Sequence, residues 1–147
     1  MIGFLLDTNC FIQIVRNRPD APNVQSLLQA VPLSRVFMSD YTMHSIGVVM
    51  SRFGQVNGYV SFLNGLGVGR GFGVAEIEVA RLEHVATVCI QHRLDFDDAY
   101  QYVAAELNNL TLVSLDTDFD RTPRGRLTPA AALQKFKDEQ SKPQQEA

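Results

Sequence analysis

Acidic residues crowd into one stretch of this 147-residue chain, between Leu94 and Asp120. The stretch holds seven of the chain's sixteen acidic residues. Six of them stand at the start of a predicted helix or directly after a predicted strand: Asp95, Asp97, Asp98, Asp116, Asp118 and Asp120. Ionised carboxylates repel one another at short range, and a positive charge between them offsets the repulsion. The stretch therefore indicates an acidic site for a divalent metal ion.

Another acidic residue, Asp7, ends the first apolar run of the chain, residues 2–6. The run is continuous, as in a strand that is buried on both faces of a parallel sheet. In such sheets ligands bind outside the carboxyl ends of the strands, where Asp7 and Asp116 would both lie. Asp7 has an alternative role as a helix cap or turn residue. With Asp98 at a helix start, three carboxylates are expected around one crevice.

An oxygen-rich crevice of this kind suits hard divalent ions such as Mg²⁺ or Mn²⁺. Such ions lower the pKa of a bound water and neutralise charge that develops on phosphate oxygens. Phosphodiester hydrolysis needs both effects. The chain's one basic cluster follows the acids directly, and its arginines are candidates to hold a flanking phosphate of the substrate: Arg121, Arg124 and Arg126.

Predicted strands and predicted helices alternate along the chain, and these elements must position the acidic residues. Short apolar runs predict strands, and apolar residues at helical spacing predict helices. Alternation of the two predicts an α/β fold, a parallel sheet with helices on both faces. The glycine-rich residues 65–73 fit no nucleotide-binding fingerprint and are interpreted as a connector or turn. Strands are expected at 2–6, 36–38, 74–79 and 110–115, and helices at 11–15, 24–30, 42–53, 56–66, 80–93, 95–107 and 130–136.

Length and composition predict a single globular domain over residues 1–137, followed by a polar, disordered tail at 138–147. The net charge of −3 argues against broad, purely electrostatic binding of nucleic acid, so such a substrate needs local basic patches or a bridging metal. No apolar run approaches about eighteen residues, and no secretory signal precedes the first strand. A cytoplasmic protein with no membrane contact is therefore expected, with Cys10 and Cys89 as reduced thiols.

Three motifs, in the same order, resemble those of the PIN domain family over residues 2–127. They are Leu6-Asp7-Thr8-Asn9, Asp98-Ala99 with Ala105 seven residues on, and Val113-Ser114-x-Asp116-x-Asp118-Phe119. The resemblance implies a three-layer α/β/α sandwich around a parallel sheet. It also implies Mg²⁺ or Mn²⁺ held by Asp7, Asp98 and Asp116 as catalytic acids. Asp118 is implied as a secondary ligand or a residue behind the ligands, Ser114 as a hydrogen-bonding orienter and Asn9 as a further supporting residue.

The same resemblance implies an activity and partners. PIN domains are metal-dependent nucleases, and many are the toxin ribonucleases of VapBC-type toxin–antitoxin pairs. A Mg²⁺- or Mn²⁺-dependent endoribonuclease is therefore expected, with RNA as the substrate and a homodimer as the assembly. An antitoxin protein is implied as partner, covering the acidic crevice with an Arg or Lys in place of the metal's charge.

One position departs from the family pattern. The family's second acid is usually the Glu of a segment like S-x-x-T-x-x-E-L, and the corresponding segment here places Ser45 at that position. A hydroxyl does not replace a carboxylate as a ligand for a hard metal ion. Three alternatives stay open: an ion bound by fewer acids, a role for His44, or weak or lost activity. As a lone histidine on a helix, His44 is also typical of a structural, hydrogen-bonded residue.

Three other functions compete with the nuclease. A catalytically silent PIN-like domain that binds RNA or protein is favoured by the missing Glu. A phosphatase- or receiver-type phosphoryl-transfer domain also places Asp at strand ends, but it needs a nearby Lys, and the chain's lysines lie only at 135, 137 and 142. A purely structural module whose acids are helix caps leaves the convergence of carboxylates unexplained.

Overall fold

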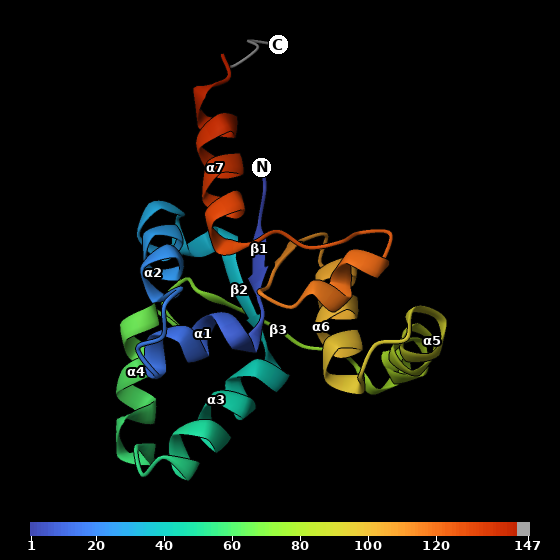
Figure 1. Cartoon of the computed structure of the whole chain (residues 1–147), viewed down its shortest axis with the longest axis horizontal. Helices are drawn as coiled ribbons and strands as arrows, with labels where there is room; N and C mark the ends of the chain where they lie inside the picture. Colours follow the sequence, from blue (N-terminus) through green and yellow to red (C-terminus); the bar gives the residue numbers. More distant parts are fainter. Residues whose placement is uncertain (144–147) are drawn as a thin grey trace.

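Four parallel strands form the central sheet of the computed structural model, which describes residues 1–143 (Figure 1). The strand order is β3-β2-β1-β4, with a crossover between each pair of neighbours. Phe4 is in register with Val36 on one side and with Thr111 on the other. The predicted α/β class is confirmed. The strands are β1 (Phe4–Leu6), β2 (Val36–Ser39), β3 (Gly73–Ala75) and β4 (Thr111–Val113).

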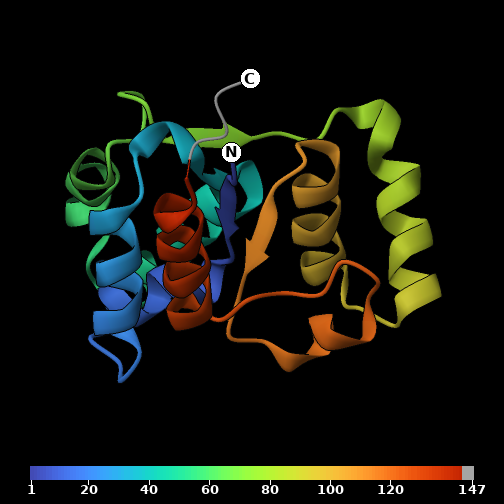
Figure 2. The ribbon, with the colours of Figure 1, turned by 90° about the horizontal axis from the view of Figure 1, so that it is seen from above.

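Helices cover both faces of the sheet and complete three layers (Figure 2). On one face α2 packs against α1 and α7, and on the other α5 packs against α6. Within the described part of the chain, no helix has both the length and the apolar character needed to cross a membrane. The helices are α1 (Thr8–Val15), α2 (Ala21–Ala30), α3 (Asp40–Arg52), α4 (Tyr59–Leu66), α5 (Leu82–His92), α6 (Phe96–Leu107) and α7 (Pro129–Ser141).

The central strand β1 divides the core in two. Phe4, Leu5 and Leu6 are fully buried, as the continuous apolar run predicted. Because successive side chains of a strand point to opposite faces, Phe4 and Leu6 enter the core beneath α1, α2 and α7. Leu5 enters the second core, beneath α5 and α6. Burial on both faces fixes the place of the residue that follows the strand, Asp7.

Three expected strands are shorter in the structure, and the first of them, β1, begins at Phe4 rather than at residue 2. The third strand was expected over residues 74–79, but β3 ends at Ala75, and the chain turns into a short 3₁₀ helix at Val79–Arg81. β4 occupies only the middle of the predicted run 110–115. β3 and β4 both lie at sheet edges, where one neighbour is missing and pairing ends sooner. The glycine-rich segment is the turn that was expected: Gly67 ends α4 with a φ of 89°, and the chain doubles back to β3.

The last helix extends past the expected domain end. α7 begins at Pro129, capped by the Thr128 hydroxyl, and continues to Ser141, so residues 138–141 are helical rather than part of a disordered tail. Glu139 explains the extension. Its carboxylate accepts a hydrogen bond from the Ile2 N–H at 3.0 Å and pairs with the Arg35 guanidinium at 2.5 Å. Residues 142–143 follow the helix without regular secondary structure, and the last part of the predicted tail, residues 144–147, lies outside the described residues.

Candidate metal centre

The acidic residues converge at the carboxyl edge of the sheet. Asp7 directly follows β1 and caps α1, Asp116 follows β4, and Asp98 lies in the first turn of α6. Asp98, Asp116 and Asp118 each offer a carboxylate oxygen within 4.8 Å of the other two. Two of the three carboxylates expected to converge, Asp98 and Asp116, therefore lie together, but the third member of the group is Asp118; Asp7 lines the same cleft as Asp98 and Asp116. The cap role that competes for Asp7 is also real, since its Oδ1 accepts from the Thr8 N–H at 2.7 Å.

Ser114 ties two of these acids together. Its hydroxyl donates to Asp7 Oδ2 at 2.7 Å and accepts from the Asp116 backbone N–H at 3.0 Å. It also accepts from the Asn9 side-chain amide at 3.1 Å, and Asn9 in turn accepts from the Leu115 N–H at 3.3 Å. Ser114 and Asn9 therefore hold the ends of β1 and β4 in one geometry, as supporting residues should.

A buried glutamine that sequence inspection missed completes the support. Gln101 is 1% exposed on α6. Its amide donates to Asp7 Oδ1 at 3.1 Å and to Thr42 Oγ1 at 2.5 Å, and its carbonyl accepts from Ser39 Oγ at 2.7 Å. Three elements, β1, β2 with α3, and α6, are joined through this one side chain. The only local signal was a polar residue on an otherwise apolar face of the helix.

The charges in the site repel one another. Burial, followed by the charges of Asp116 and Asp7, raises the pKa of Asp98 to about 7. Burial also raises the pKa of Asp7, although Ser114, Thr8 and Gln101 all donate to its carboxylate and oppose the shift. Carboxylates held together against such repulsion are the donor set that a hard divalent cation fits. Asp98, Asp116 and Asp118 could therefore hold a metal ion, with Asp7 directly beside them.

The turn that carries Asp116 and Asp118 is anchored in the core. It is a short 3₁₀ helix, Thr117–Arg121, in which Asp116 Oδ1 accepts from the Asp118 N–H at 2.9 Å. Phe119 lies in the same turn and is fully buried in the core beneath α5 and α6. The buried Phe119 side chain thus holds the turn in place, and the turn positions the carboxylates of Asp116 and Asp118.

Phe119→Ala should lower the free energy of unfolding by about 3 to 5 kcal/mol, because it removes a large side chain and leaves a cavity. Thermal unfolding monitored by circular dichroism measures the loss. Leu107→Ala serves as the control, since Leu107 is 41% exposed at the end of α6. Equal shifts in the two variants would show that Phe119 does not anchor the turn.

The acids form one wall of a cleft of about 850 Å³. Tyr41, His44 and Ser45 of α3 also line the cleft, and Ser45 and Asp97 lie beside the Tyr41 hydroxyl. Two cations that sequence inspection missed, Arg18 and Arg52, also line it. The cleft therefore combines carboxylates that could hold a cation with two arginines, which suits a phosphate-bearing substrate.

The PIN domain family model matches residues 4–125. The chain belongs to the PIN domain family. The expected family is thereby confirmed, and the match spans both the strand ends and the acidic turn. No curated protein matches the chain.

Solved structures share the fold of this PIN domain at low sequence identity. A chain of a toxin–antitoxin complex from Klebsiella pneumoniae is 22% identical, with a TM-score of 0.68 over 86% of this chain and 98% of that one. FitAcB from Neisseria gonorrhoeae is 22% identical, with a TM-score of 0.66 over 86% and 97%. PAE2754 from Pyrobaculum aerophilum is 17% identical, with a TM-score of 0.68 over 93% and 96%. The likeness extends over nearly the whole of each relative.

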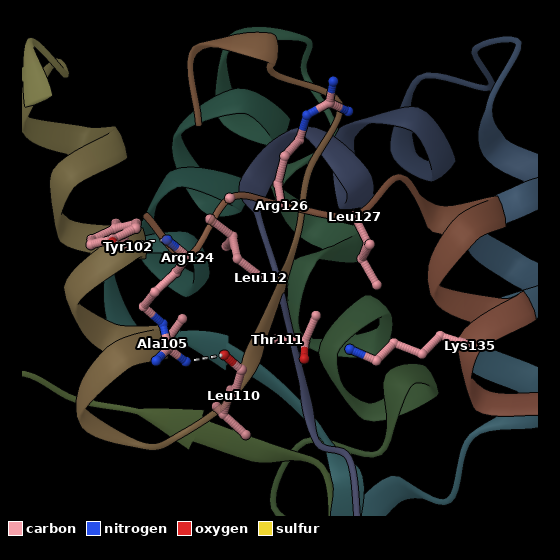
Figure 3. A pocket seen from close by; sticks show the side chains of 10 residues that line it. Tyr102, Ala105, Leu110, Thr111, Leu112, Arg124, Arg126, Leu127 and Lys135 are labelled. Carbon is pink, nitrogen blue, oxygen red and sulfur yellow. Dashed lines mark hydrogen bonds between the residues drawn. The ribbon is translucent and has the colours of Figure 1, made fainter. Parts of the chain in front are cut away.

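Two of the three arginines expected to serve this PIN domain's substrate, Arg121 and Arg126, lie beside the acidic turn. Arg121 pairs with Asp118 at 3.1 Å. Arg126 is occupied by Asp120 at 3.2 Å and by the Ser114 carbonyl at 3.1 Å, so it braces the acidic turn instead. Arg124 does not lie beside the acids, contrary to the expectation. Its guanidinium donates to the Leu110 carbonyl, at the opposite end of β4 from the acids (Figure 3).

Proposed function

We propose that this PIN domain is a ribonuclease that depends on Mg²⁺ or Mn²⁺, and that it is the toxin of a toxin–antitoxin pair. The observation that carries the proposal is the approach of Asp98, Asp116 and Asp118 within 4.8 Å, beside a buried Asp7. A divalent ion bound there supplies an acidified water and neutralises charge on the scissile phosphate. Membership of a family of nucleases agrees with this chemistry.

Each residue of the site has a distinct role in this proposal. Asp98, Asp116 and Asp118 hold the cation, and Asp7 adds negative charge from a position set by Ser114 and Gln101. Arg18 and Arg52 hold phosphates on either side of the scissile bond, because they line the same cleft. Arg121 adds a further positive charge beside Asp118.

An antitoxin partner and a homodimer complete the proposal. The partner is supported by a structural relative described as part of a toxin–antitoxin complex. The acidic cleft suits a segment that carries an Arg or Lys, whose charge would take the place of the cation. Light scattering coupled to size-exclusion chromatography tests the dimer.

The competing proposal is a silent PIN domain that binds RNA or protein without cleavage. Ser45 favours it, since this side chain lines the cleft at the position where the family usually has a Glu. The two proposals differ in what a metal ion does: it should support cleavage in the first and leave RNA intact in the second.

The deciding experiment incubates the purified, folded chain, free of any partner, with a mixed RNA pool and with single-stranded DNA. Mn²⁺, Mg²⁺ and chelator are compared. RNA fragments that appear with either metal and vanish with chelator support the ribonuclease. Intact RNA under all three conditions refutes it and favours the silent domain, while equal cleavage of DNA removes the RNA specificity.

Ser45→Glu should tighten Mn²⁺ binding by roughly tenfold, because it adds a carboxylate to the cleft at the family's position. The same variant should be less stable without metal, since the new charge repels Asp97 and Asp98. A Mn²⁺ titration followed by thermal unfolding measures both effects. Ser26→Glu on the exposed face of α2 controls for added charge. Unchanged Mn²⁺ affinity would favour the alignment in which His44 takes that role.

A further inference from the structure

We propose that this chain has a second anion site, a pocket at the outer edge of β4 that binds a phosphate group. The pocket has a volume of about 250 Å³, and β4, α6, α7 and the segment 124–127 form its walls (Figure 3). It is smaller than the roughly 300 Å³ at which pockets for drug-sized ligands begin. A phosphate or a sugar phosphate matches that size.

The charge of the pocket is positive. Three of its lining residues are basic, namely Arg124, Arg126 and Lys135, and none of its lining residues is acidic. Asp120 neutralises Arg126, but within residues 1–143 neither Arg124 nor Lys135 forms a salt bridge. Both side chains are exposed, and together they give the pocket a positive charge that suits an anionic ligand.

Arg124 is held in place for such a ligand. One Nη donates to the Leu110 carbonyl at 3.0 Å, and the backbone N–H donates to the Tyr102 hydroxyl at 3.4 Å. The single side-chain bond orients the guanidinium and leaves its other N–H groups for a ligand. Figure 3 shows Lys135 on the other side of the pocket, with its ammonium directed toward Thr111.

A backbone donor points into the same space. The Leu112 carbonyl accepts from the Leu127 N–H at 2.9 Å, on the side of β4 away from β1, while the Thr111 N–H donates to Gly3 on the β1 side. Both polar groups of one strand residue face the same side, so the Leu112 N–H also faces away from β1. No group among residues 1–143 accepts from it, although Leu112 is buried. Buried N–H groups rarely lack a partner, and a phosphate oxygen would supply one.

This pocket is separate from the acidic centre. It shares no lining residue with the cleft that the acids line, although Arg126 of its wall also bonds Asp120 and the Ser114 carbonyl. The phosphate could be a free phosphate or a nucleotide, or it could belong to the backbone of a bound nucleic acid. The chemistry is shared, and only the size of the preferred ligand distinguishes the sources.

The test titrates the ¹⁵N-labelled chain with inorganic phosphate, with adenosine monophosphate and with a short single-stranded RNA, all in chelator. The Leu112 amide resonance should shift on titration. Arg124→Gln combined with Lys135→Gln should weaken the affinity at least tenfold. The control pair, Arg81→Gln with Lys137→Gln, removes two exposed cations outside the pocket and should bind like the wild type.

The outcomes separate this site from the nuclease proposal, because no metal and no cleavage are involved. Tighter binding of phosphate or the monophosphate identifies a free ligand, and tighter binding of RNA identifies a nucleic-acid backbone. An unmoved Leu112 resonance with all three probes overturns the proposal. Equal affinity of the pocket variant and the control variant overturns it as well.

Discussion

Asp98→Asn should abolish metal-dependent RNA cleavage, with a loss of about 100-fold or more, while the protein stays folded. The reason is that Asp98 is one of the three carboxylates that residues 1–143 bring within reach of a common cation, and an amide does not carry their charge. A bound metal contributes several kcal/mol of charge stabilisation, and each 1.36 kcal/mol corresponds to a tenfold change in rate. Initial cleavage rates with saturating Mn²⁺ measure the loss.

Asp138→Asn, on the exposed part of α7, is the matched control and should cleave at the wild-type rate. Full activity of Asp98→Asn would exclude Asp98 from the site. If both the wild type and the variant are inactive, the nuclease proposal itself fails, which is a different result.

The same substitution should change how stability depends on pH when metal is absent. The folded state keeps a proton on Asp98 up to about pH 7, whereas an unfolded aspartate releases it near its model value of 3.8. Between these values the folded state binds more protons, so the wild type should lose stability as pH rises from about 4 to about 7. Asp98→Asn should reduce that slope, as urea unfolding in chelator at several pH values would show. Identical slopes would mean that Asp98 ionises normally.

Gln101→Leu should lower the free energy of unfolding by about 2 to 3 kcal/mol. The substitution keeps the volume of the side chain but removes its buried hydrogen bonds to Ser39 and Thr42, each worth about 0.5 to 1.5 kcal/mol, while these two hydroxyls still bond each other. Asp7 also loses a donor to its carboxylate. Urea unfolding measures the change, and Gln25→Leu, exposed on α2, is the control.

If Gln101 positions Asp7, its substitution should also change the metal dependence of cleavage. At a temperature where wild type and variant are both folded, Gln101→Leu should need more Mn²⁺ for half-maximal cleavage, because Asp7 is no longer held by α6. Reduced stability with an unchanged Mn²⁺ requirement would leave Gln101 with a purely structural role.

Much of the acidic centre could be located from local sequence patterns. The run before Asp7 is continuously apolar, so a strand buried on both faces, and hence its carboxyl end, could be predicted without a structure. Asp116 follows a second such run, and parallel strands bring their carboxyl ends to one edge. The family pattern added Ser114, and the structure places its hydroxyl between Asp7 and Asp116.

The features that sequence patterns missed or misplaced depend on contacts between distant parts of the chain. Gln101 bonds Asp7, 94 positions away, and no local period reports such a pairing. Arg124 follows the acids in sequence, but the turn after β4 reverses the chain and carries its guanidinium back to Leu110. The expected tail at residues 138–141 became helical because Glu139 meets Arg35, 104 positions away. Side-chain partners of this kind exist only once the layers have packed, which is why a sequence pattern predicts the strand ends but not the buried network behind them.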